Sequence, residues 1–70
     1  MSLDGNGEWQ EISEDFYIKV LDDTDCLIHI ESTAPKPLVK GETIFLKRNT
    51  WCRIIKGSKD LSIEHFFYKY

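Results

Sequence analysis

Apolar side chains recur at every second position in several short segments of this chain, and this period constrains its fold more than any other feature. Phe16, Ile18 and Val20 alternate with their neighbours, which is the pattern of a strand with one buried face. The predicted strands are residues 9–12, 16–21, 26–31, 43–47, 51–56 and 61–68. This spacing predicts an all-β fold, a small antiparallel sandwich or barrel of five to six short strands.

Turn-forming residues separate the predicted strands. Residues 22–25 read Asp-Asp-Thr-Asp and predict a tight turn that joins residues 16–21 and 26–31 into a hairpin. Two prolines predict that residues 32–40 form an extended connection or a sheet edge, because proline donates no ladder hydrogen bond. Residues 58–70 leave a helix open as an alternative, although their β-branched and aromatic residues favour a strand.

The length of the chain limits how much stability it can gain alone. Residues 1–7 contain two glycines and almost no apolar side chain, so we expect a flexible arm followed by a single β domain over residues 8–70. At 70 residues, apolar burial only just offsets chain entropy, which favours a staple, a metal or a partner subunit. No apolar run is long enough for a membrane span or signal peptide. We therefore expect a soluble chain made inside the cell.

Charge is divided unequally along the chain. Residues 1–31 carry nine acidic side chains and one basic one, a balance of −8, whereas residues 32–70 carry eight basic and three acidic, a balance of +5. The two regions can satisfy each other within one fold or between copies. The net charge of −3 argues against a dedicated duplex-DNA binder.

Cys26, His29, Cys52 and His65 are the residues with metal-binding or nucleophilic chemistry. Their spacing is poor for zinc, because positions 26 and 29 face opposite sides of a strand and the other two lack a near companion. A Cys26–Cys52 disulfide would require adjacent strands and an oxidising compartment. Two buried thiols are the favoured interpretation. We assign no catalytic, cofactor-binding or metal-binding residue and expect neither enzymatic activity nor a cofactor.

Cations and aromatic rings are interleaved in the second half of the chain. Phe45, Arg48, Trp51 and Arg53 form the group that could bind a peptide or single-stranded nucleic acid, where bases stack on rings and cations follow phosphates. In a small β domain such rings are more often part of the core. Nucleic acid is therefore the disfavoured ligand.

Aromatic residues also fill the C-terminal segment. Strand geometry cannot place neighbouring rings in one core, so we expect Phe66, Tyr68 and Tyr70 to face an oligomer interface. The end of the chain packing on its own domain is the alternative. The predicted core is Trp9, Phe16, Ile18, Ile28, Ile30, Ile44, Leu46, Ile54 and Ile63.

The order of these features resembles that of small β-rich structural proteins of tailed bacteriophages. The shared order is a Trp-containing segment at 9–12, strands at 16–18 and 27–30, Ser-x-x-Pro at 32–35, Gly41 before an apolar strand, an aromatic strand at Trp51, Gly-Ser at 57–58 and a last strand at 61–63. The resemblance implies a capsid decoration, head-fibre or tail-associated subunit. The charge division and the aromatic last strand depart from that pattern.

The resemblance also implies partners and a location. We expect a homo-oligomer, with a trimer as one arrangement, which contacts other virion proteins and no membrane. The chain would be synthesised in the host cytoplasm and reside in the virion. The alternative is an SH3- or OB-like binding module that uses the Phe45, Arg48, Trp51 and Arg53 group.

Overall fold

The computed structural model describes residues 7–67, which form seven strands and no helix. The strands are β1 (Gln10–Glu11), β2 (Phe16–Val20), β3 (Leu27–Ile30), β4 (Lys36–Pro37), β5 (Thr43–Leu46), β6 (Trp51–Ile55) and β7 (Ile63–Phe66). They form a four-stranded sheet in the order β1-β6-β3-β4 and a three-stranded sheet in the order β5-β2-β7, and all pairs are antiparallel. The predicted all-β character is confirmed.

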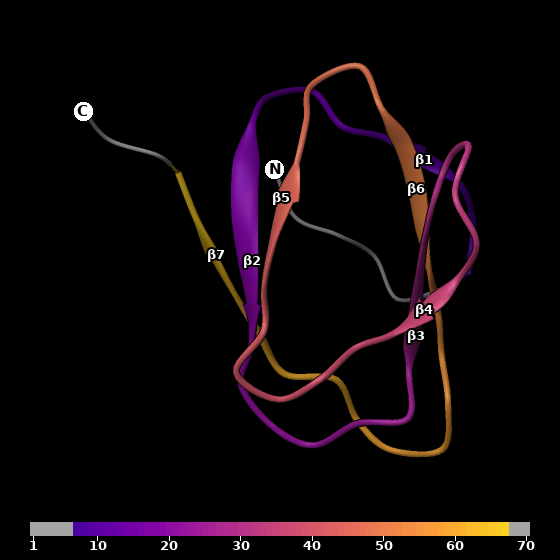
Figure 1. Ribbon diagram of the computed structural model, residues 1–70, viewed down its shortest axis with the longest axis vertical. Helices are drawn as coiled ribbons and strands as arrows, with labels where there is room; N and C mark the ends of the chain where they lie inside the picture. The colour runs from indigo at the N-terminus through magenta and orange to yellow at the C-terminus, as the bar shows by residue number, and fades with distance from the viewer. Residues whose placement is uncertain (1–6, 68–70) are drawn as a thin grey trace.

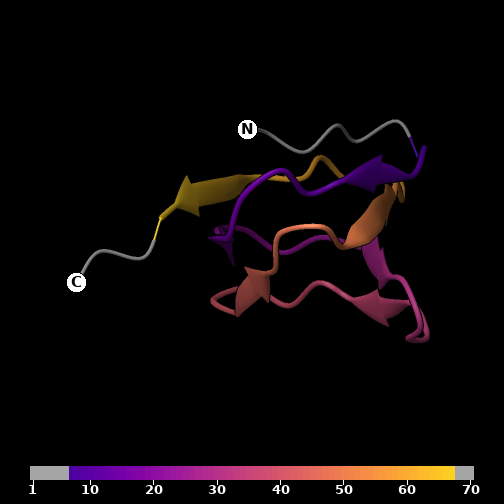
Figure 2. The same cartoon turned by 90° about the horizontal axis from the view of Figure 1, so that it is seen from above.

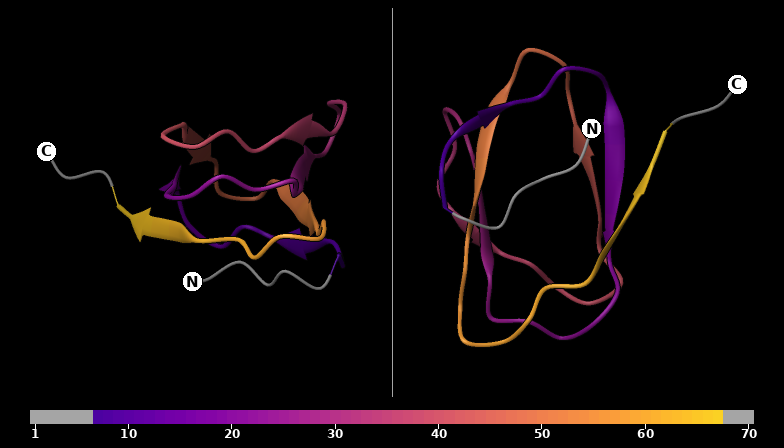
Figure 3. Two further views of the ribbon diagram at one scale, coloured as in Figure 1. Left: turned by 90° about the horizontal axis from the view of Figure 1, so that it is seen from below. Right: turned by 180° about the vertical axis from the view of Figure 1, so that it is seen from behind.

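The chain passes between the two sheets at almost every connection. Figure 1 shows the three-stranded sheet on the left and the four-stranded sheet on the right, with connections that cross at both ends of the molecule. Only β3 and β4 are paired strands that also follow each other in sequence. Views from above and from behind keep the two sheets apart, with β5 and β7 at opposite ends of the smaller sheet (Figures 2 and 3).

The predicted hairpin between residues 16–21 and 26–31 is wrong. β2 pairs with β5 and β7, whereas β3 pairs with β4 and β6 in the other sheet. Residues 22–25 therefore carry the chain across the end of the core instead of returning it alongside β2. Polar turn residues permit either path, because they specify a change of direction and not the strand that becomes the neighbour.

The core lies between the two sheets and includes side chains from both. Its buried members are Ile12, Phe16, Ile18, Val20, Cys26, Ile28, Leu38, Ile44, Leu46, Cys52 and Ile54, with Ile30, Leu61 and Ile63 packed against it. Most of the predicted core is confirmed. Trp9 is the exception, since this residue is 42% exposed. Leu38 was missed because it follows the proline segment, outside any alternating pattern.

Carboxylates stabilise the connections at both ends of the molecule. Asp15 accepts a hydrogen bond from the Arg48 N–H at 2.7 Å, which ties the β1–β2 connection to the β5–β6 connection. Asp25 accepts hydrogen bonds from the Ser58 N–H at 2.8 Å and the Lys59 N–H at 2.9 Å. A hydrogen bond from the Ser58 hydroxyl, together with these two backbone bonds, holds the pKa of Asp25 well below its usual range.

Gly57 permits this close approach. A Cβ atom at position 57 would lie 2.7 Å from the Asp25 carbonyl oxygen and would also collide with the carboxyl group. The β2–β3 and β6–β7 connections therefore meet at a position where only glycine fits without movement of the backbone.

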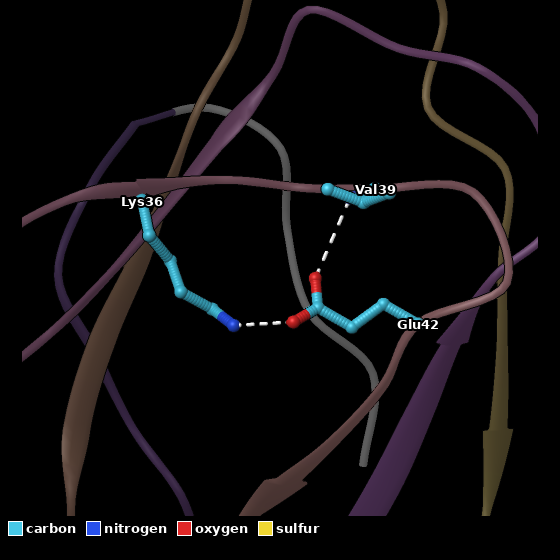
Figure 4. Close-up of polar contacts among 3 residues, drawn as sticks. All are labelled: Lys36, Val39 and Glu42. Carbon is cyan, nitrogen blue, oxygen red and sulfur yellow. Dashed lines mark hydrogen bonds and ion pairs between the residues drawn. The ribbon is translucent and has the colours of Figure 1, made fainter.

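The proline segment and the last strand agree with the predictions made for them. β4 is the edge of its sheet, as expected for residues 32–40, and β7 is a strand, so the helical alternative is wrong. Between β4 and β5, Glu42 contacts the Lys36 ammonium at 2.5 Å and accepts a hydrogen bond from the Val39 N–H at 3.4 Å (Figure 4). The hydrogen bond from Lys36 is the main reason that the pKa of Glu42 is lowered.

Candidate interaction surfaces

Three aromatic rings cross the outer face of the three-stranded sheet. Tyr17 on β2 is the register partner of both Phe45 on β5 and Phe66 on β7. Its ring centroid lies 5.0 Å from that of Phe45 and 5.4 Å from that of Phe66, and the second pair is stacked at 10°. Phe45 is 46% exposed and Phe66 is 38% exposed. We call these three residues the aromatic row.

Strand alternation produces the aromatic row. Ile18, Ile44 and the other inward positions fill the core, so the odd positions of β2 and β5 must face outward. Phe66, one of the three residues expected at an interface, belongs to the row, whereas Tyr68 and Tyr70 lie outside the described residues. Tyr17 was not among the predicted interface residues. Its outward position beside Phe16 and Ile18 was the available signal.

A different aromatic arrangement lies on the four-stranded sheet. The Trp9 ring centroid lies 4.8 Å from that of His29, and the Arg53 guanidinium carbon lies 5.1 Å from the centroid of Trp9. His29 and Arg53 are register partners on β3 and β6, and the Nε2 of His29 contacts the Thr33 carbonyl at 2.9 Å. Nδ1 of His29 and Nε of Arg53 are buried without a hydrogen-bond partner within residues 7–67. We call Trp9, His29 and Arg53 the Trp9 cluster.

The residues of the alternative ligand group are divided between surfaces. Phe45 belongs to the three-stranded sheet, whereas Trp51 and Arg53 lie on β6 of the four-stranded sheet. Arg48 lies in the connection between β5 and β6, where its backbone N–H bonds to Asp15. One small ligand therefore cannot contact Phe45 and Trp51 on the same sheet face.

Trp51 is 44% exposed and has acidic neighbours on both sides. Glu11 is its register partner on β1, and the backbone N–H of Glu31 donates to the Trp51 carbonyl at 2.9 Å. Both glutamates are exposed. Acidic residues at the backbone positions on either side of Trp51 disfavour phosphate and favour a cationic group at this position.

A half-open cavity of about 310 Å³ lies near the β6–β7 connection. It is lined by Cys26, Ile54, Lys56, Asp60, Leu61, Ile63 and His65. The Cys26 sulfur accepts the Gly57 N–H at 3.5 Å and lies 3.7 Å from the Lys59 carbonyl oxygen. The thiol thus contributes to packing beneath the connection. His65 stacks on Phe16 with centroids 5.6 Å apart, and burial lowers its pKa.

Both cysteines are free and buried, in agreement with the favoured interpretation of two buried thiols. Burial raises the pKa of Cys52 to about 11, which keeps this thiol protonated at neutral pH. Within residues 7–67, no three His, Cys, Asp or Glu side chains are grouped closely enough to hold a metal ion. The same part of the chain contains no helix that is long and apolar enough to cross a membrane.

Comparisons of this chain with protein-family models, curated proteins and solved structures found no match. The surfaces described above are therefore the structural features that bear on function. Tyr17, Phe45 and Phe66 contact one another across one sheet face, whereas on the four-stranded sheet the Trp9 ring packs on His29 and Arg53.

Proposed function

We propose that this chain is a non-enzymatic structural protein that acts by binding copies of itself and other proteins of an assembly. In this proposal the two sheets make up a small antiparallel sandwich, and its outer faces are the binding surfaces. The exposed aromatic row of Tyr17, Phe45 and Phe66 is the observation that carries the proposal.

Exposed rings in contact with one another favour an interface. Phe45 and Phe66 leave large parts of their rings in water on either side of Tyr17, so a partner that covers the row removes one continuous apolar strip from solvent. Tyr and Phe are enriched at protein interfaces for this reason. A 70-residue chain also gains stability from a partner that binds only the folded state.

We further propose that the assembly is the particle of a tailed bacteriophage, in which the chain is a capsid decoration, head-fibre or tail-associated subunit. The resemblance in the order of sequence features supports this assignment. In this account the chain is made in the host cytoplasm and resides in the virion, with no cofactor.

The test compares the oligomeric mass of the unaltered chain with that of the Phe45→Ala and Phe66→Ala double variant by size-exclusion chromatography with light scattering. We expect the double variant to lose self-association and to keep its β circular-dichroism signal. Val39→Ala is the matched control, because Val39 is an exposed apolar residue outside the row. If the double variant keeps the mass of the parent, the row is not the interface.

A second candidate function is supported by Trp51. An exposed ring on the four-stranded sheet, with Arg53 on the same strand, fits a binding module for a peptide or single-stranded nucleic acid. The flanking Glu11 and Glu31 favour a basic peptide of these two ligands. Titration with an oligonucleotide and with an oligolysine peptide separates them. Binding of the oligonucleotide that weakens steeply with salt would favour the nucleic-acid module over aromatic assembly.

A further inference from the structure

The four edge strands of the two sheets differ in how well they are protected against pairing. β1 and β4 have two residues each, and β4 contains Lys36 and Pro37. β7 carries the charged Glu64 at an exposed position. β5 is Thr-Ile-Phe-Leu, without charge, proline or glycine. Short length, charge and proline are the usual protections of an edge, and β5 has none of them within its strand.

The hydrogen bonds of β2 show which backbone groups of β5 face outward. The Val20 N–H donates to the Glu42 carbonyl at 2.9 Å, and the Gly41 N–H donates to the Val20 carbonyl at 2.8 Å. Because bonded and non-bonded pairs alternate in an antiparallel ladder, the backbones of Ile44 and Leu46 also point toward β2. The N–H and C=O groups of Thr43 and Phe45 therefore point away from the sheet. In Figures 2 and 3, no described segment lies beyond β5 on this side.

We propose that a second copy of this chain pairs with β5 through its own β5, antiparallel and with Phe45 opposite Phe45 of the partner subunit. This inference rests on the proposed self-assembly and names its contact. The two three-stranded sheets would join into one continuous sheet around a two-fold axis.

The self-complementarity of β5 determines this register. With Phe45 at the axis, Ile44 lies opposite Leu46 of the partner subunit, so apolar residues meet on the core side. On the outer side, Thr43 lies opposite Lys47 of the partner subunit. The two aromatic rows then meet end to end, and the exposed Phe45 rings of the two copies cover each other.

The neighbouring antiparallel registers, with the two-fold axis at residue 44 or 46 instead of 45, lose these contacts. One shift places Thr43 opposite Phe45 of the partner subunit, and the other places Phe45 opposite Lys47 of the partner subunit. Neither brings the two Phe45 rings together. The pairing of Thr43 with Lys47 therefore identifies the proposed register, and charge at these two positions can test it.

The experiment measures the dimer dissociation constant by sedimentation equilibrium for four variants and the parent. Thr43→Lys places a lysine opposite Lys47 in both symmetric pairs. We therefore expect the dissociation constant of the dimer to be about tenfold higher than that of the parent. Thr43→Glu is the matched variant of opposite charge, and we expect its dimer to be at least as tight as the parent dimer. Thr43→Lys with Lys47→Glu should restore the dimer, and Thr43→Glu with Lys47→Glu should weaken it again.

Restoration reports on contact between copies. Residues 43 and 47 of one chain are roughly 13 Å apart along an extended strand, so their direct interaction is weak at physiological salt. Lys19 is the register partner of Thr43 within the chain. Its charge acts on residue 43 equally whether position 47 is Lys or Glu, so it does not explain restoration. Circular dichroism and thermal melting verify that each variant is folded.

The outcomes distinguish failure of the β5 contact from failure of self-assembly. Weakening by Thr43→Lys and restoration by Lys47→Glu support pairing through β5. If the parent associates and none of the four variants changes its dissociation constant, pairing through β5 is wrong and assembly uses another surface. If the parent stays a monomer at every concentration, both the edge contact and self-assembly are wrong.

Discussion

Aromatic residues on the outer faces of the two sheets differ in the groups that they contact. On the four-stranded sheet, Trp9 lies against His29 and Arg53 and covers polar atoms of its own sheet. On the three-stranded sheet, Phe45 and Phe66 each pack on Tyr17 and remain 46% and 38% exposed. The comparison teaches that aromatic exposure alone does not identify an interface. Exposed rings that do not pack on polar groups of their own sheet are the better candidates.

The largest expected effect on stability is at the contact between the β2–β3 and β6–β7 connections. Gly57→Ala forces a methyl group against the backbone of Asp25, so the β2–β3 and β6–β7 connections must separate. We expect a loss of about 1–3 kcal/mol in the free energy of unfolding, the usual cost of overpacking. Urea denaturation measures it. Ser58→Ala, which keeps the backbone donors, should cost less, and equal costs would show that the steric argument is wrong.

Removal of the Trp9 ring from the four-stranded sheet should affect folding more than assembly. Trp9→Ala removes the ring over Arg53 and its packing on His29, so we expect the free energy of unfolding to fall by about 1 kcal/mol. Water then reaches the two buried nitrogen atoms and limits the loss. The mass in solution should not change. If Trp9→Ala kept its free energy of unfolding and lost self-association, the interface would lie on the four-stranded sheet.

Truncation of Phe45 in the aromatic row should affect assembly more than folding. Phe45→Ala removes a half-exposed ring that contacts Tyr17, so we expect the free energy of unfolding of the monomer to fall by only about 0.5 kcal/mol. Self-association should decline strongly. Denaturation at low concentration and sedimentation at high concentration measure the two effects separately, and a large loss of monomer stability without loss of association would contradict the assignment.

Acid should destabilise the fold in two separate steps. Burial lowers the pKa of His65 from 6.5, so below that pH the unfolded chain binds a proton that the folded chain resists, and stability declines. Asp25 has a pKa lowered from 3.8, so its contribution is complete above that pH and is lost as the pH falls further. Stability measured against pH should show both steps.

Asp25→Asn is the control for this assignment. The amide does not titrate, so the lower step should shrink to the part that the lowered pKa of Glu42 contributes, while the decline that begins near pH 6.5 remains. An undiminished lower step in Asp25→Asn would assign it to other carboxyl groups.

The sequence predicted which face of most strands is buried, but it did not predict which strands pair. Phe16, Ile18 and Ile44 were placed correctly because alternation directly reports a buried face. The false hairpin arose because residues 22–25 have the same composition whether the chain returns beside β2 or crosses to the other sheet. Pairing depends on contacts between distant segments, such as β2 with β5 and β7.

The candidate surfaces were predictable to a smaller extent. Phe66 was expected to face outward because neighbouring rings cannot enter one core, and it does so. Trp9 was expected in the core, yet its ring packs on Arg53 and His29 at the surface and is partly exposed. The separation of Phe45 from Trp51 follows from sheet membership, which alternation does not encode.

The central claim is that the aromatic row of Tyr17, Phe45 and Phe66 is an assembly interface. Sedimentation velocity of the unaltered chain, over a range of concentrations and at low and high salt, tests it most directly. The account predicts an oligomer whose population rises with concentration and persists at high salt, because apolar burial is not screened by ions. A monomer at every concentration and salt level would contradict it.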